Sequence, residues 1–322
     1  MPPKEPAAIP RRDAVLSPAA AAAAGIEPPP APAAGDHLVM LGTGGGPVLN
    51  RFNTQTAIDL VVAGVQYLID CGAGAPRRIV EAGMGFSNLR HVFVTHHHLD
   101  HLAGYPELLV LGSSAREVDV WGPPPIEALH DGLVGAFAHS VELFDGGAVP
   151  PSRFRVHEVM LPERGVATVM EDENLRVSAT RVFHGAEVRD AYAYRFDVRR
   201  TGGSVVFSGD TAGPNEQLIE LARDADILIH EVQLNARLDL ILDQVEPPRR
   251  EALRRHLVTT HTDVADLPRV AKAANAKRLV MCHYVPAFLP PTEFLTEARK
   301  AAEAVRYEGE IVAPEDLDVI VL

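Results

Sequence analysis

The sequence predicts an α/β protein. Short runs of apolar and β-branched residues alternate with segments of helical periodicity, and this order recurs as two successive halves, each with strands followed by helices. Several strands end directly in polar side chains, and ligand sites in α/β sheets gather at strand ends. No short-period repeat is present. We therefore expect an α/β domain whose functional residues meet at the ends of its strands.

Composition limits the partners of the protein. The chain has 322 residues, of which 47% are hydrophobic, enough for a sizeable core. The net charge of −13 disfavours long-range attraction to nucleic acid or to an anionic membrane, although bound divalent ions would still allow a small anionic substrate. Cys71 and Cys282 are too few for a disulfide scaffold and are expected to be small buried residues. Without a run of about 18 apolar residues, no membrane span is predicted.

The N-terminal segment, residues 1–36, is rich in Ala and Pro and is expected to lie outside the folded domain, which then spans 37–322. Its layout resembles a twin-arginine export signal, with Arg11-Arg12, a weakly apolar segment at 14–26 and small residues at Ala31-Pro32-Ala33. We therefore expect a periplasmic or exported protein. The alternative is a disordered tail on a cytoplasmic protein.

Apolar runs in the first half of the domain predict strands at 38–41, 55–62, 66–69, 91–94 and 117–121. Helices are expected at 77–82, where Gly83 ends the helix, at 107–111 and at 126–144. The glycine-rich segment 42–47 lacks the Gly-Lys-Ser/Thr of a phosphate loop. We interpret it as a tight turn that lets the backbone pass close to the functional site.

The second half predicts strands at 153–170, 175–182, 227–229 and 278–282, and a hairpin of 191–198 with 203–207. Pro214 opens a helix that runs to 223, and an amphipathic helical lid is expected at 235–256. A helical run, interrupted by Pro268, follows His261 to residue 276. The last predicted helix, 292–307, is expected to be capped by Thr292.

A cluster of histidines follows the predicted strand at 91–94 and reads His96-x-His98-x-Asp100-His101. His96 and His98 lie two residues apart and project to one side of an extended chain, whereas Asp100 and His101 follow the next bend and can face a second point. Imidazole and carboxylate are ligands that suit zinc and similar ions. A tag-like histidine cluster would neither follow a core strand nor include an ordered Asp. The segment therefore predicts a metal site.

Further polar residues follow apolar strands in the second half: His184, Asp210, Glu231, His261 and His283. A lone histidine at a strand end is usually structural, so their shared placement is the informative observation. Two ions about 3.5–4 Å apart need roughly six or seven protein donors and a shared carboxylate. We predict two triads bridged by Asp210, namely His96, His98 and His184 for one ion, and Asp100, His101 and His283 for the other.

Two strand-end residues outside this set have other interpretations. Asp70 either caps the helix that follows it or orients a metal-bound histidine from behind. His230, next to Glu231 but on the opposite face of the same strand, is interpreted as structural.

This pattern resembles the metallo-β-lactamase superfamily, and within it the ribonuclease Z and arylsulfatase-like branch. The supporting stretches are Leu41-Gly42-Thr43-Gly44, Leu68-Ile69-Asp70-Cys71-Gly72, Phe207-Ser208-Gly209-Asp210-Thr211, Ile229-His230-Glu231 and His261-Thr262. The resemblance covers residues 38–322 and implies an αββα four-layer sandwich with the metal site at the edge of its two sheets. It also implies that His261 contacts the scissile group beside the metals.

We expect a dinuclear metal-dependent hydrolase in which a hydroxide bridging two divalent ions attacks a small ester, such as a phosphodiester or a sulfate ester. Zinc is the preferred metal, with manganese and iron as alternatives. The catalytic residues are predicted to be His261, Asp100 and Glu231. His261 would stabilise developing negative charge or protonate the leaving group, and Glu231 would orient it, unless Glu231 is only a solvated strand-end carboxylate.

Ribonuclease Z enzymes that process tRNA often carry a long Gly/Pro-rich arm between the equivalents of His184 and Asp210. Here the predicted hairpin uses this interval, and the chain is acidic. We therefore expect a small-molecule ester as substrate, nucleic acid as an unlikely partner, and a homodimer as the oligomer to test. The alternatives are a ribonuclease Z-like RNA 3′-processing nuclease, a lactonase or β-lactam hydrolase and, least favoured, a non-catalytic scaffold.

Overall fold

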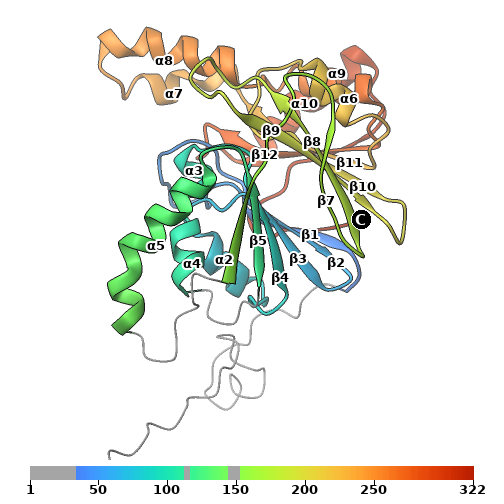
Figure 1. Cartoon of the computed structure of the whole chain (residues 1–322). Helices are drawn as coiled ribbons and strands as arrows, with labels where there is room; N and C mark the ends of the chain where they lie inside the picture. The colour runs from blue at the N-terminus through green and yellow to red at the C-terminus, as the bar shows by residue number, and fades with distance from the viewer. Residues whose placement is uncertain (1–33, 112–116, 144–152) are drawn as a thin grey trace, which may run out of the picture.

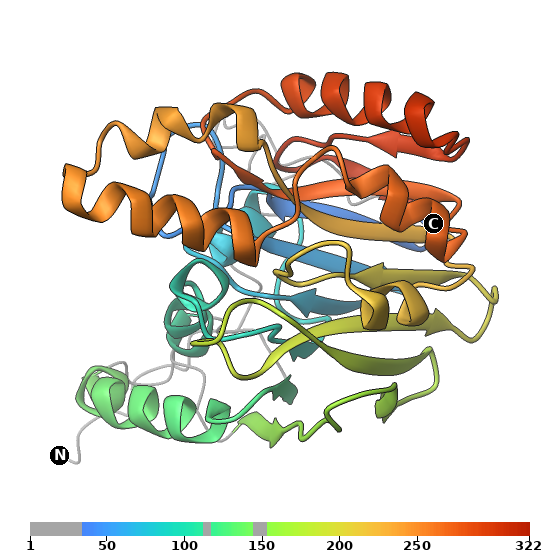
Figure 2. The same ribbon diagram turned by 90° about the horizontal axis from the view of Figure 1, so that it is seen from above.

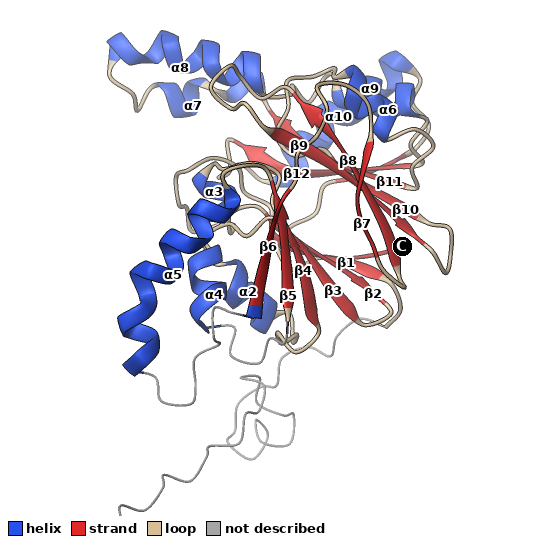
Figure 3. Ribbon diagram, in the orientation of Figure 1, coloured by secondary structure: helices blue, strands red, loops and turns tan. Residues whose placement is uncertain are grey.

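Two seven-stranded sheets packed face to face form the centre of the molecule, with helices on both outer sides (Figures 1 and 3). The computed structural model describes residues 34–111, 117–143 and 153–322. The predicted leader lies outside these ranges except for its last three residues, so it stays a prediction. The four layers confirm the expected αββα sandwich.

The first sheet joins both ends of the described chain. Its strands, in spatial order, are β14 (Val319–Val321), β1 (His37–Gly42), β2 (Ala57–Val62), β3 (Val65–Ile69), β4 (Leu89–Phe93), β5 (Val118–Gly122) and β6 (Phe154–Glu158). The neighbours from β14 to β3 are antiparallel, and those from β3 to β6 are parallel. The parallel part places the carboxyl ends of its strands along one edge of the sandwich.

The second sheet has the same division. Its strands, in spatial order, are β13 (Glu310–Val312), β12 (Arg278–Val285), β11 (Ile227–Gln233), β10 (Ser204–Phe207), β9 (Ala191–Val198), β8 (Leu175–Val182) and β7 (Ala167–Glu171). Strands β10 to β13 are parallel, whereas β7 to β10 alternate in direction. The predicted hairpin of β9 and β10 is confirmed.

Helices cover the outer face of each sheet. On the first sheet these are α2 (Ala75–Glu81), α4 (Tyr105–Leu111) and α5 (Ile126–Leu143); on the second they are α6 (Glu216–Leu221), α9 (Leu267–Ala274) and α10 (Pro291–Val305). The short helix α3 (Leu99–Leu102) follows β4, and α7 (Asp239–Leu242) and α8 (Pro247–Thr260) project beyond the sheets (Figure 2). Among the described helices, none is both long and apolar enough to cross a membrane.

Apolar side chains pack in three layers, because the central strands are buried on both faces. Strand β2 shows the principle: Ile58 and Leu60 face the core between the sheets, while Ala57 and Val61 face the helices. Between the sheets, Phe93 packs edge-on against Phe196, with ring centroids 5.0 Å apart. This central core fixes the two sheets relative to each other, and thereby the strand ends that carry the polar residues.

Several predicted boundaries were wrong. The strand expected at 153–170 is two strands, β6 and β7, which lie in different sheets on either side of a connection that contains Gly165. Thr292 does not cap helix α10. The helix begins at Pro291, whose fixed backbone angle suits the first helical position, and the N-cap residue is Pro290. The predicted run after His261 becomes helical only at Leu267. The region of the predicted lid forms a 3₁₀ turn, α7 and α8.

Asp59 on β2 is an exception to the apolar outer core. Its side chain is fully buried and lies opposite Val39 on β1 and Leu68 on β3, both apolar. Burial raises the pKa of its carboxyl group from 3.8 to about 8. The group therefore stays protonated in the folded protein across a pH range in which the unfolded chain carries it ionised.

We predict that Asp59→Val stabilises the protein by an amount that grows with pH. Between about pH 4 and pH 8 the unfolded state loses the Asp59 proton and the folded state keeps it, so wild-type stability falls over this window and the variant is spared that loss. Thermal unfolding of both proteins from pH 4 to 9 measures the effect. A difference in Tm that stays constant with pH would show that Asp59 is not protonated in the folded state.

Candidate metal centre

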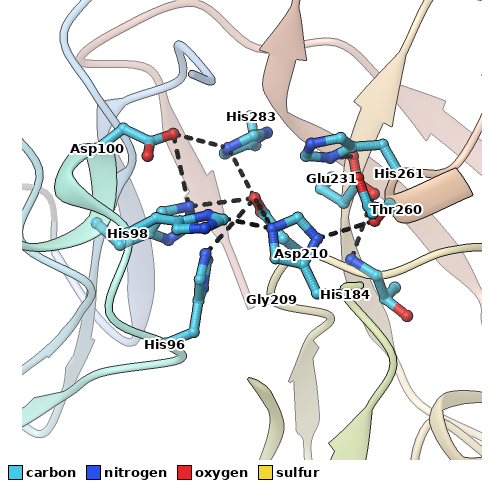
Figure 4. Close-up of polar contacts among 12 residues, drawn as sticks. His96, His98, Asp100, His184, Gly209, Asp210, Glu231, Thr260, His261 and His283 are labelled. Carbon is cyan, nitrogen blue, oxygen red and sulfur yellow. Dashed lines mark hydrogen bonds and ion pairs between the residues drawn. The ribbon is translucent and has the colours of Figure 1, made fainter. Parts of the chain in front are cut away.

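The predicted ligands come together at one edge of the sandwich (Figure 4). The segment after β4 supplies His96 and His98, and α3 supplies Asp100 and His101. From the second sheet, His184 follows β8, Asp210 follows β10 and His283 lies within β12. His97 points elsewhere, because its Nε2 bonds the carbonyl oxygen of Pro123 at 2.8 Å. The two sheets thus contribute to one cluster.

One carboxylate oxygen lies at the centre of this cluster. The Oδ2 atom of Asp210 is 3.1 Å from Nε2 of His283, 3.4 Å from that of His101, 3.6 Å from that of His184 and 3.8 Å from that of His96. Asp210 is buried, as are all four imidazoles around it. Both predicted triads therefore meet at Asp210.

The donor atoms fall into groups that could each hold an ion. In each group the ligand atoms lie within 4.8 Å of one another; the groups are His96, His98, His184 and Asp210; Asp100, His101 and His283; and Asp210, His261 and His283. The first two match the predicted triads, with Asp210 joining the first. The third group offers a second interpretation of this region, in which His261 is a metal ligand.

Unpaired buried atoms test whether these residues fit metal ions. Within the described residues, Nε2 of His96, Nε2 of His101 and Oδ1 of Asp210 are buried without any hydrogen-bond partner. Buried polar groups without a partner are costly, and native structures rarely tolerate several in one place. Cations between these donors would satisfy all of them. The imidazole and carboxylate chemistry of the set suits divalent ions.

The electrostatics of the cluster are strongly coupled. Burial opposes the charged form of Asp210, but His283 and His101 outweigh it and hold the pKa of this carboxyl group well below its usual range. Burial lowers the pKa of His184 to about 4, so this imidazole is neutral and can ligate at neutral pH. In contrast, Asp210 and Asp100 raise the pKa of His283 to about 10 against the effect of its burial. An ion bound there would have to displace this proton.

A second set of groups holds the cluster residues in place from behind. Asp70 accepts a hydrogen bond from Nδ1 of His101 at 2.7 Å, and its carboxylate also accepts bonds from the backbone N–H and the hydroxyl of Thr95. The carbonyl oxygen of Thr260 lies 2.9 Å from Nδ1 of His184. Of the two interpretations of Asp70, orientation of a histidine is the one that the structure supports, because the N-cap residue of α2 is Gly74.

His261 lies at the C-terminal end of α8, beside the cluster. Its Nδ1 is 3.3 Å from Oε2 of Glu231, while Oε1 of Glu231 accepts a bond from the backbone N–H of Thr262 at 2.8 Å. Burial opposes the charge on His261, but the carboxylate of Glu231 outweighs it and raises the pKa of the imidazole. Glu231 is 1% exposed, so it is not a solvated strand-end carboxylate. His230 on the opposite face is buried and bonds a backbone carbonyl.

The glycine-rich turn approaches the cluster as predicted. The backbone N–H of Gly46 donates to Oδ2 of Asp100 at 2.7 Å. A Cβ atom on Gly45 would lie 2.4 Å from Nδ1 of His283, so no side chain fits between the turn and this imidazole. The turn therefore contacts two of the predicted ligands through backbone alone.

Asp316 near the C-terminus joins the start of this turn, at Thr43, to Thr54, which follows the turn along the chain, and this contact was not predicted from the sequence. Its Oδ1 accepts bonds from the backbone N–H and the hydroxyl of Thr43, and its Oδ2 accepts from the backbone N–H of Thr54 and from Arg78. Nothing within the turn points to a partner so far along the chain. The only signal is an acidic residue just before the last strand.

The family is established by comparison with known proteins. A family model described as the beta-lactamase superfamily domain matches residues 66–284. The chain belongs to this superfamily. Among curated relatives, the ribonuclease Z of Mycobacterium bovis is 30% identical over 292 residues, which cover 87% of this chain and 96% of the relative. The ribonuclease Z of Myxococcus xanthus is 31% identical and covers 85% of this chain and 94% of its own length.

Solved structures show the same superfamily fold. Human tRNase Z, short form, superimposes with a TM-score of 0.62 at 22% identity, covering 88% of this chain and 98% of that one. A metallo-beta-lactamase fold protein from Bacillus subtilis gives 0.64 at 17% identity, covering 88% and 98%. These similarities support the fold, and the predicted family of metal-dependent hydrolases of ester bonds is confirmed.

The expectation that nucleic acid is an unlikely partner was wrong. It depended on the acidic composition and on the missing arm, whereas the curated relatives that align along nearly the whole chain are named ribonuclease Z. They favour the RNA-processing alternative over the small-ester interpretation.

We predict that Asp316→Ala weakens both the fold and the binding of divalent ions. The change leaves the N–H groups of Thr43 and Thr54 unpaired, which should lower the free energy of unfolding by about 2–4 kcal/mol. It also releases the turn that holds Asp100 and His283. Denaturant unfolding and titration with Co²⁺, followed by absorbance, measure the two effects.

Asp318→Ala is the matched control, because among the described residues the carboxylate of Asp318 accepts a bond only from the N–H of Glu315, within an exposed turn. Equal metal affinities of the two variants would contradict this role of Asp316.

Proposed function

We propose that the chain is a ribonuclease Z-like phosphodiesterase that cleaves RNA near its 3′ end with two zinc ions. The observation that carries the proposal is the cluster of seven donor residues centred on Asp210, which is one of them, next to a histidine backed by Glu231. Its support is the 30–31% identity to curated ribonuclease Z proteins along most of the chain. A diester of phosphate gives such a cluster a negatively charged centre to bind.

The residues that would hold the ions are His96, His98, His184, Asp210, Asp100, His101 and His283. The excess of imidazole over carboxylate favours zinc. When bound, the ions would supply Lewis acidity and lower the pKa of a coordinated water. Their positive charge would also offset the acidic character of the chain where the phosphate must approach.

Among the side chains, His261 has the central role in the proposed reaction. Glu231 fixes Nδ1 of this imidazole as the donor in their shared hydrogen bond and favours its protonated form. Nε2 is then the nitrogen available to the substrate, either to stabilise negative charge on the phosphate or to give a proton to the leaving oxygen. His261 is 9% exposed, so little solvent reaches its imidazole.

Asp100 and Glu231 complete the proposed catalytic group in different ways. The N–H of Gly46 and Nε2 of His283 both contact the carboxylate of Asp100, which fixes this carboxylate as a ligand for one ion. Glu231 acts through His261 and is a positioning residue. Bonds from the backbone N–H of Thr262 and of Thr211 to its Oε1 leave Oε2 for the imidazole.

The choice of substrate is tested with three compounds and metal-replete protein. We expect cleavage of a precursor tRNA transcript at the 3′ end of its acceptor stem, in preference to hydrolysis of bis-p-nitrophenyl phosphate or p-nitrophenyl sulfate. Asp210→Ala should abolish the cleavage, which excludes a contaminating nuclease. Turnover of the small esters with an intact transcript would overturn the RNA proposal and restore the small-ester interpretation.

We predict that His261→Ala lowers turnover by about 100-fold or more while bound metal is retained, in line with the loss of general acid–base catalysis. Asp210→Ala should lose both turnover and metal, since Asp210 belongs to two of the three donor groups and lies 3.4 Å from His101 of the other. Metal content by mass spectrometry and single-turnover kinetics separate the two effects. His139→Ala is the control, because this histidine is exposed on α5.

Loss of metal from His261→Ala would contradict the division of roles. It would instead favour the third donor group, in which His261 acts as a ligand together with Asp210 and His283.

A further inference from the structure

Helices α7 and α8 form an arm that projects from the edge carrying the metal centre (Figures 1 and 2). The arm has a small apolar core of its own, in which Leu238 and Leu242 pack against Val285 of β12. Its base is joined to the site directly, because α8 ends at Thr260, whose carbonyl oxygen bonds His184, and is followed by His261. Anything that lies along α8 is therefore led to the metal centre.

The charge of α8 is opposite to that of the whole chain. The 14 residues of this helix, Pro247–Thr260, contain four arginines and one glutamate, whereas the chain has a net charge of −13. Two of these arginines face α7: Arg250 pairs with Asp243, and Arg254 pairs with Asp239. These ion pairs attach the two helices to each other.

The other two arginines lie toward solvent. At 100° per residue, Arg249, Ala252, Arg255, His256 and Thr259 share one face of α8, and all but the half-buried His256 are exposed. Arg249 forms no ion pair within the described residues. Arg255 is 71% exposed, and its ion pair with Glu251 is long, at 3.9 Å, and therefore weak.

This face runs from the tip of the arm toward the site. At 1.5 Å per residue, Arg249 and His256 are about 10 Å apart along the axis. His256 contacts Glu187, three residues after His184, at 2.9 Å. An exposed face that served only solubility could carry the negative charge of the rest of the chain. Here the exposed face is positively charged, next to a centre that would bind an anionic substrate.

We propose that this face of α8, defined by Arg249, Ala252, Arg255, His256 and Thr259, binds the sugar–phosphate backbone of the RNA and guides it to the metal centre. The inference rests on the proposed function and adds its docking surface. The occupant is a polyanion because the face offers guanidinium groups and small side chains, while Leu253 and Leu257 of the same helix pack against the apolar core of the arm. Contact with phosphates gives register without reading sequence.

The test uses the full-length, metal-loaded protein with Arg249→Glu and Arg255→Glu combined. Arg164→Glu combined with Arg299→Glu is the matched control with the same change of net charge, since both arginines are exposed and form no ion pair within the described part of the chain. Filter binding of a precursor tRNA transcript gives Kd at several salt concentrations. We expect the α8 variant, Arg249→Glu with Arg255→Glu, to raise Kd at least about 10-fold near 0.1 M salt. The slope of log Kd against log salt should fall by roughly 1–2.

The outcomes separate the docking surface from the proposed function. Tight binding of the transcript without cleavage by the wild type, weakened only by the α8 variant, would support the surface while the function fails. Cleavage by the wild type, with equal Kd for the α8 variant and the control, would overturn the surface alone. A parallel loss of bis-p-nitrophenyl phosphate hydrolysis in the α8 variant would also overturn it, because the arginines would then act on the site itself.

Discussion

The structure depends on the charge balance around one buried carboxylate. Four imidazoles from both sheets point their Nε2 atoms at Oδ2 of Asp210 within 3.8 Å. Burying ions costs several kcal/mol each unless opposite charge compensates them. Several donor atoms here have no partner within the described residues, so side chains alone do not satisfy the cluster. The sandwich brings together a set of groups that is complete only when cations are added.

The rest of the edge holds these groups in one orientation. Asp70 fixes His101, the carbonyl oxygen of Thr260 fixes His184, and the N–H of Gly46 fixes Asp100. Each support comes from a different element from the group that it holds. The donors themselves come from both halves of the sandwich, so the cluster is complete only when the two sheets have packed. Such supports set the orientation of a ligand before an ion arrives. The same logic explains a turn of glycines beside His283, where any side chain would displace the ring.

Much of this could be predicted from the sequence, because the relevant residues follow apolar strands. The pattern His96-x-His98-x-Asp100-His101 indicates a metal site from its own spacing. The strands that precede His184 and Asp210, and the strand that contains His283, are long or apolar enough to be recognised. What could not be predicted depends on long-range pairing. Strands β13 and β14 have three residues each and exist through their neighbours. The alternation across 153–170 fits a strand but does not show that the chain changes sheets.

The net charge of the whole chain was a poor guide to its partner, because it says little about the charge at a particular site. At 0.1 M salt, charges interact over about 10 Å, so distant carboxylates contribute little at a particular edge. The charge that matters to an approaching phosphate is the local one, and here it includes any bound ions and the arginines of α8. Bound divalent ions and these arginines would make this edge more favourable to a polyanion than the net charge of −13 suggests.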